Sequence, residues 1–180
     1  MTQTLRLNLP DFCAHGEARE GVLAPESFAR LHAEVVEVVS GRWHVEGRLA
    51  LRQELPEYEG RPILDLSVEA VLRVACVRCL EPVEMAVRVE RGFVAVESDA
   101  EADEALTEDD RYDAVVSSLQ FDLAGLIEDE ILMALPAQPR HERCSPQALA
   151  ALGLSADEEG VALQVPKDNP FAVLQALKKH

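Results

Sequence analysis

The sequence predicts an α+β protein built on a largely antiparallel β-sheet, with one long hairpin and helices on its flanks. Two long runs, residues 63–75 and 83–97, alternate apolar and polar side chains, which is the period of strands with one buried and one wet face. Only the turn-rich residues 76–82 separate them, so the runs are expected to pair as a hairpin, with a bulge or a bend at Gly92. Helical patterns lie on both sides of this strand-rich middle, which favours the α+β class.

The N-terminal part is expected to add two strands and one helix to this hairpin. Residues 4–9 alternate in the same way and indicate an early strand, whereas residues 12–22 have no periodicity and predict no element. Pro25 suits the first turn of a helix, and a β-branched run after residue 35 is expected to fray it. The apolar face of that helix carries Phe28, Leu31 and Val35. Residues 43–52 then alternate again, as a strand with one wet face does.

A second helix is predicted late in the chain. Asp122 is a good N-cap residue, and Pro136 ends the helical pattern. The apolar side of this helix carries Leu123, Leu126, Ile127, Ile131, Ala134 and Leu135. The acids fall mainly on the other, solvated side, and they are Glu128, Asp129 and Glu130. Glu130 lies close enough to the apolar stripe to need a partner.

The remaining segments are expected to be looser parts of one domain that covers residues 1–180. Residues 97–113 hold nine acids and one arginine, with few large apolar side chains, so they predict a flexible acidic loop that leads into a short strand at residues 112–119. Weak patterning predicts a second flexible segment at residues 145–168. Asn169 and the proline after it then begin a terminal helix with a short apolar stripe.

The composition narrows the classes of partner. The chain has 33 acidic and 17 basic residues, a net charge of −16, which argues against a protein that coats nucleic acid and favours a basic partner. No apolar stretch reaches the roughly 18 residues that a membrane span needs, and no secretory signal is visible, so a cytoplasmic protein is expected. In a reducing cytosol the four cysteines are not expected to form structural disulfides.

Two short motifs carry the chemistry that this sequence offers. Cys76-x-x-Cys79 and His141-x-x-Cys144 together supply three sulfurs and one imidazole, a ligand set that suits tetrahedral zinc. More than sixty residues separate the two pairs, so a site requires the fold to bring the loop after the second helix to the tip of the hairpin. The plainer interpretation, cysteines that pack as small residues or form one pair of thiols, is favoured over zinc at this point. A redox pair is a further alternative, but such pairs usually lie at a helix N-terminus.

Four ordered stretches, residues 76–82, 122–136, 139–144 and 169–174, together resemble the YceD family of bacterial large ribosomal RNA subunit accumulation proteins. The resemblance implies a non-enzymatic factor that 23S rRNA needs in order to accumulate, and thus a role in large-subunit biogenesis. Members of that family lie beside the gene for a small basic ribosomal protein of the large subunit. The resemblance extends to Cys76, Cys79, Cys144 and the acidic helix with Glu128, Asp129 and Glu130.

The partner hypothesis follows from this resemblance and from the charge. The acidic surface, with Glu128, Asp129 and Glu130 as candidate partner-binding residues, is expected to engage a basic large-subunit ribosomal protein or a pre-50S particle, so that 23S rRNA is protected indirectly. Two alternatives stay open. One is a thiol oxidoreductase that uses Cys76 and Cys79, and the other is a zinc-stabilised interaction module without a ribosomal connection.

Overall fold

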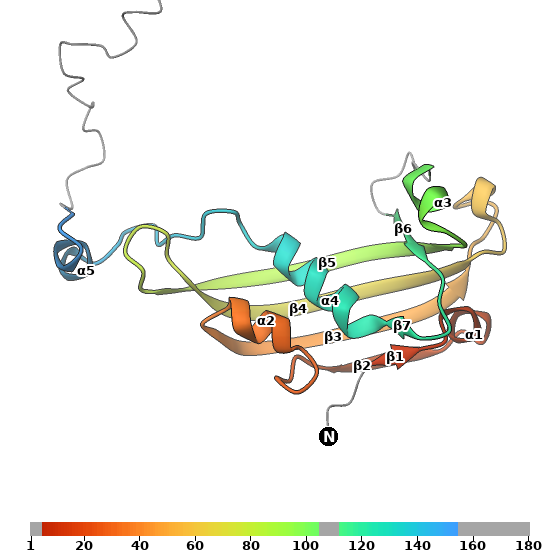
Figure 1. The fold of residues 1–180 in the computed structure, drawn as a ribbon, viewed down its shortest axis with the longest axis horizontal. Helices are drawn as coiled ribbons and strands as arrows, with labels where there is room; N and C mark the ends of the chain where they lie inside the picture. The colour runs from red at the N-terminus through yellow and green to blue at the C-terminus, as the bar shows by residue number, and fades with distance from the viewer. Residues whose placement is uncertain (1–4, 105–111, 155–180) are drawn as a thin grey trace, which may run out of the picture. The chain divides into compact units, whose positions relative to one another are not determined.

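The computed structural model describes residues 5–104 and 112–154. Contacts between residues divide the chain into two compact units, residues 1–141 and 142–180, and the prediction of one domain over the whole chain stays a prediction. The first unit is an α+β fold with a mostly antiparallel sheet, which confirms the predicted class (Figure 1). In the second unit the described structure is one short helix, α5 (Pro146–Ala151), whose first turn is capped by the Ser145 hydroxyl, which accepts the Ala148 N–H at 3.1 Å.

The sheet has five strands in the order β2-β3-β4-β5-β6. Strands β2 to β5 pair antiparallel, and the edge strand β6 pairs with β5 in parallel. The predicted hairpin is present as β4 and β5, whose pairing runs without interruption from Ile63 opposite Val94 to Ala75 opposite Pro82. The strands are β2 (Ala18–Val22), β3 (Glu37–Leu49), β4 (Pro62–Ala75), β5 (Pro82–Val96) and β6 (Tyr112–Val116).

The remaining elements of the first unit are short, except for one helix. A two-stranded sheet joins β1 to β7 in antiparallel pairing. The long helix is the predicted one, since the Asp122 carboxylate accepts the Gly125 N–H at 3.1 Å and caps it. The elements are β1 (Arg6–Leu7), α1 (Leu9–Ala14), α2 (Ala29–Glu34), η1 (Pro56–Tyr58), α3 (Asp99–Glu104), β7 (Phe121–Asp122) and α4 (Leu123–Ala134).

The N-terminal region differs from its sequence-based prediction. The early strand is shorter than expected, because Asn8 caps a helix, α1, that has Pro10 in its first turn. Apart from Leu9, which was expected to end the early strand, that helix and strand β2 occupy residues for which no element was predicted. Strand β3 begins at Glu37, directly after the turn that follows α2, so the β-branched residues expected to fray the helix belong to a strand instead.

Gly92 does not form the predicted bulge. Its strand stays in register with β4 on one side and β6 on the other. A Cβ at this position would lie 2.5 Å from Tyr112 Cε1, so the glycine makes room for the tyrosine ring. The sheet has its irregularity elsewhere, between Val38 and Ser40 in β3.

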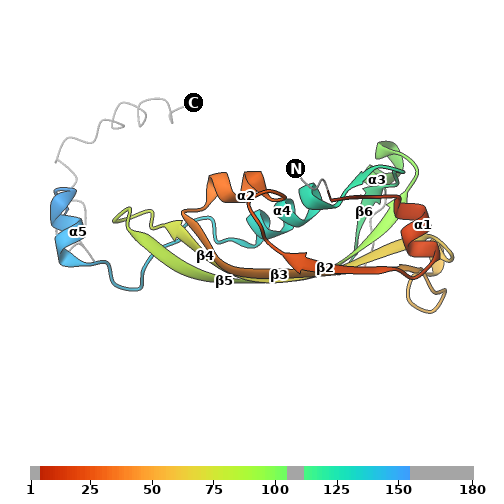
Figure 2. The ribbon, with the colours of Figure 1, turned by 90° about the horizontal axis from the view of Figure 1, so that it is seen from below.

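Helices α2 and α4 lie on the same face of the sheet (Figure 2). Leu64 and Leu72, on the same face of β4, are fully buried, and so are Ile127 and Ile131 of α4. Phe28 packs edge-on against Trp43, with ring centroids 6.5 Å apart. Each such buried side chain contributes about 1.5–3 kcal/mol, so this layer holds the fold together.

On the opposite face, a smaller apolar cluster covers one end of the sheet. Ala50 and Leu55, from the connection between β3 and β4, pack there against Ile63 and Val94. The middle of this face carries no helix of the described first unit (Figure 2).

Several predicted segments are only partly described. Helix α3 forms the start of the acidic segment, where a loop was expected, and α5 falls at the start of the second segment expected to be flexible. Residues 105–111 and the terminal helix expected from residue 169 lie outside the described residues. Within the described ranges, no helix is long and apolar enough to cross a bilayer.

Candidate metal centre

The tip of the β4–β5 hairpin positions Cys76 and Cys79. The Cys76 N–H donates to the Glu81 carbonyl at 2.9 Å, and the Leu80 N–H donates to the Cys76 carbonyl at 2.9 Å, so the tip is a closed and hydrogen-bonded turn. Leu80 has a φ of +61°, a left-handed conformation that costs a bulky residue about 1 kcal/mol or more. The turn buries both thiols, leaving Cys76 0% and Cys79 4% exposed.

The segment that follows α4 lies against this tip. The Val77 N–H donates to the Pro139 carbonyl at 2.9 Å, and the ring of His141 reaches the Pro82 carbonyl at 3.0 Å. These two contacts span about sixty residues of sequence and bring the second motif to the first. The fold thereby brings the loop after α4 to the hairpin tip, as a metal site formed by the two motifs requires.

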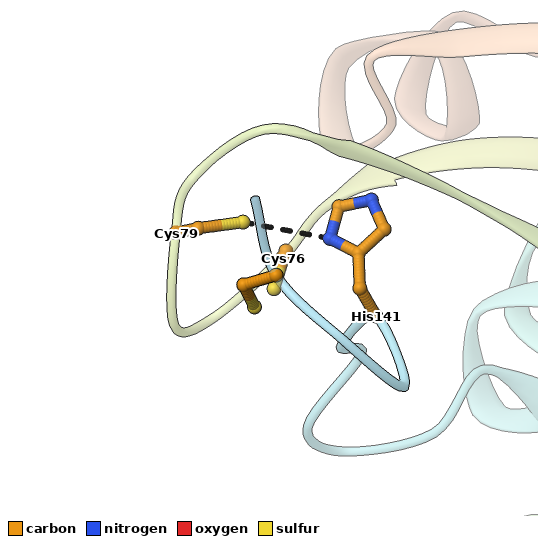
Figure 3. A group of neighbouring side chains, drawn as sticks. Cys76, Cys79 and His141 are labelled. Atoms are coloured by element: carbon orange, nitrogen blue, oxygen red, sulfur yellow. Dashed lines mark hydrogen bonds between the residues drawn. The ribbon is translucent and has the colours of Figure 1, made fainter. Parts of the chain in front are cut away.

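The histidine presents a lone pair to the sulfurs. Its Nδ1 lies 3.4 Å from Cys79 Sγ (Figure 3). Its Nε2 faces the Pro82 carbonyl, and because a carbonyl oxygen can only accept a hydrogen bond, Nε2 carries the ring proton. A second hydrogen bond of this kind is what fixes the orientation and tautomer of histidines that bind metals. The donor atoms of Cys76, Cys79 and His141 all lie within 4.8 Å of one another, which suits a single ion.

The backbone around the tip stabilises a thiolate. Burial by itself raises the pKa of Cys76, but the backbone N–H groups of Cys79, Arg78 and His141 donate to its sulfur and lower the pKa to about 5. The thiolate is the form of cysteine that binds metal ions. These N–H donors have no sequence signal of their own, because every residue except proline carries one.

Cys144 belongs to the second unit, and the covalent chain alone limits its distance. Two residues separate it from His141, so the two Cα atoms cannot lie more than about 11 Å apart. That reach is sufficient for a fourth ligand. The sulfur is part-buried.

The acids of α4 are placed differently from the solvated face that was predicted. Glu128 is 7% exposed, and its carboxylate accepts the Leu31 N–H at 2.8 Å. The first turn of α2 has no side-chain cap of its own, so Glu128 acts as its cap from another helix. Arg30 supports this contact with an ion pair to Glu128 at 3.8 Å and another to Asp129. The prediction of a solvated position is therefore wrong for Glu128.

Glu130 is also 7% exposed and faces Arg91 of β5, whose Nε lies 3.9 Å from its carboxylate. Arg91 is thus the partner that Glu130 was expected to need next to the apolar stripe. Burial raises the pKa of Glu130, and the nearby Arg91 opposes that shift. Asp129 is the exposed member of the three. Partner binding by these three acids stays a prediction.

Comparisons with known proteins agree with the resemblance seen in the sequence. A family model described as "Large ribosomal RNA subunit accumulation protein YceD" matches residues 64–178. A Haemophilus influenzae protein of that same name is 29% identical over 163 residues, which cover 88% of this chain and 86% of that protein. No solved structure matches the chain.

Proposed function

Because the chain belongs to the YceD family, we propose that it is a non-enzymatic factor that 23S rRNA needs in order to accumulate during large-subunit assembly. The observation that carries this proposal is the family match. It spans both motifs of the candidate metal centre, helix α4 and most of the C-terminal part. The proposed direct partner is a basic large-subunit ribosomal protein or a pre-50S particle, and the rRNA is protected through it.

Charge supports a basic partner. A chain with a net charge of −16 is repelled by the phosphate backbone of RNA at long range and is attracted to lysine-rich and arginine-rich proteins. An acidic factor binds and shields such a basic protein by charge complementarity alone, without catalysis.

We further propose that Cys76, Cys79, His141 and Cys144 bind one structural zinc ion. Three sulfurs and one imidazole are a common ligand set of structural zinc sites. The lone pair of the imidazole and the lowered pKa of Cys76 favour metal binding. When bound, the ion would cross-link the hairpin tip to the chain after α4.

A thiol oxidoreductase is the less favoured alternative. Both thiols of the hairpin are buried, so a substrate disulfide has no approach to the sulfur. They also lie in a β-hairpin rather than at a helix N-terminus, where redox pairs usually occur. An insulin-reduction assay with the purified protein tests this alternative, and activity above the no-enzyme rate would revive it.

Deletion of the gene tests the ribosomal role. We expect the ratio of 23S to 16S rRNA to fall in the deletion strain, and the plasmid-borne chain to restore it. The tagged protein should co-sediment with pre-50S particles in a sucrose gradient. Normal 23S rRNA levels in the deletion strain would contradict the proposal.

A further inference from the structure

The sheet face opposite α2 and α4 is an exposed surface in its middle part. Strands β2, β3, β4 and β5 all contribute to it, and their register aligns the contributing side chains in rows. Arg42 is 77% exposed and Arg88 is 70% exposed, so no helix or loop among the described residues of the first unit covers these positions. We call this surface the open face.

The open face is acidic. Its side chains include seven carboxylates and four guanidinium groups, a net charge of −3. The acids are Glu20, Glu37, Glu46, Asp65, Glu69, Glu84 and Glu90, and the bases are Arg42, Arg48, Arg73 and Arg88.

Each arginine of the open face is already paired within the protein. Arg42 pairs with Glu69, and Arg88 pairs with Glu90 at 2.6 Å. Arg73 donates to Glu84 at 2.8 Å and also pairs with Glu37, while Arg48 lies 2.5 Å from Asp65. None of these four arginines therefore remains to neutralise the acids at the β2–β3 edge.

Two acids at the β2–β3 edge have no arginine partner. Among the described residues, Glu20 and Glu46 form no ion pair with an arginine or lysine. Their strands are neighbours, with Glu20 opposite His44 and Glu46 opposite Ala18, so both carboxylates project from the same side of the sheet. This edge therefore concentrates negative charge that the protein itself does not balance.

Apolar side chains lie beside these acids. Val22 is 68% exposed at the end of β2, and the half-buried Val71 and exposed Ala86 follow across β4 and β5. A shallow hollow of about 820 Å³ is lined by all three, together with Arg42 and Arg88. A neighbouring hollow of about 600 Å³ includes Glu20 and His44. Val22 is exposed in a hollow close to Glu20, an acid without an arginine partner. This combination suits a polypeptide segment that carries both apolar and cationic side chains.

We propose that the open face is the docking surface for a basic polypeptide, with Glu20 and Glu46 binding its lysine or arginine side chains and Val22, on the side of Glu20 away from Glu46, contacting an apolar residue next to them. The inference rests on the proposed function, because it gives that function its binding surface. It also moves the surface away from α4, where Glu128 caps α2 and Glu130 faces Arg91, so that two of the three acids on α4 are committed to internal contacts.

Matched charge reversals in the full-length protein test the assignment. The probes are the basic large-subunit ribosomal proteins of the source organism, each purified singly and titrated against the protein at one fixed ionic strength. The test variant is Glu20→Lys with Glu46→Lys. The control variant is Glu34→Lys with Glu57→Lys, which makes the same change in net charge at exposed residues outside the open face. Thermal unfolding of each variant checks that it is folded.

We expect the test variant to weaken binding roughly tenfold or more, because it places like charges against the partner. The control variant, and Asp129→Lys on α4, should change affinity less than about twofold. Equal losses in the test and control variants would reduce the effect to net charge and overturn the open face as the docking surface. Loss in Asp129→Lys alone would place the surface on α4 instead.

The wild-type protein separates this inference from the proposed function. If it binds none of the probes, the proposed basic partner is wrong, and the docking surface falls with it. If it binds one of them and the test variant binds equally well, the partner stands and only the open face is refuted.

Discussion

Two buried cysteines of this protein show opposite chemistry at the same exposure. Cys13 in α1 is 1% exposed, and Cys76 at the hairpin tip is 0% exposed. Burial raises the pKa of Cys13 to about 11, and its thiol donates a hydrogen bond to the Ile63 carbonyl at 3.1 Å. At Cys76 the backbone N–H groups of the turn donate to the sulfur and lower the pKa to about 5.

Burial raises the pKa of both thiols, so the number of backbone N–H groups that donate to each sulfur, one at Cys13 and three at Cys76, accounts for the contrast. A thiol that faces a carbonyl must keep its proton, so Cys13 behaves as a small apolar core residue. A sulfur that faces several N–H groups is stabilised as an anion, which is ready for a metal ion.

Metal content should distinguish the two cysteines most strongly. We expect about one zinc ion per chain in protein expressed with zinc, and loss of that zinc in Cys76→Ser. Because binding of a structural zinc ion stabilises the fold, the melting temperature should fall by about 10 °C or more. Elemental analysis and a thermal scan measure both. Cys13→Ser is the control and should retain the metal, and zinc-free wild-type protein would contradict the site.

The stability of the metal-free protein should depend on pH through Cys76. A pKa lowered from 9.0 to about 5 stabilises the folded form at high pH, and this contribution is lost as the pH falls from 9.0 towards 5. Denaturant unfolding of the metal-free proteins measures this effect. The free energy of unfolding of the wild type should fall as the pH is lowered over this range, and that of Cys76→Ser should lack this dependence. Parallel curves would mean that the N–H groups do not stabilise the thiolate.

Cys13→Ala should destabilise the protein without affecting the metal. Removing the buried sulfur leaves a small cavity in the contact between α1 and the sheet, at a cost of about 1–2 kcal/mol in the free energy of unfolding. Denaturant unfolding measures the loss. Zinc content should equal that of the wild type, and a lower content would show that Cys13 and the hairpin tip are coupled.

Leu80→Gly should give the smallest effect, and of opposite sign. Glycine accepts the positive φ of this position without strain, and Leu80 is 63% exposed, so little buried area is lost. We expect a gain of about 0.5–1 kcal/mol in the free energy of unfolding. Val77→Gly, at an exposed position of the same tip, is the matched control and should give no gain.

Much of the fold could be predicted because its strongest patterns are local. The alternation in residues 63–75 and 83–97 and the Asp122 cap specify the hairpin and α4 by themselves. The failures lie where a local signal was short or had a second interpretation. The cap at Asn8 begins a helix of only six residues, and Gly92 makes room for a distant ring and forms no bulge in its strand.

The ligand types, the net charge and the family can be read from the amino-acid sequence, because they depend on residue identity and spacing. Which of these groups meet depends on the folded chain. It brought His141 to Cys79 and turned the lone pair of the imidazole towards the sulfur through the Pro82 carbonyl. It also buried Glu128 and Glu130 beneath neighbours far away in sequence. The physical reason is that these contacts depend on long-range packing and on backbone donors and acceptors that all residue types share, so no local pattern encodes them.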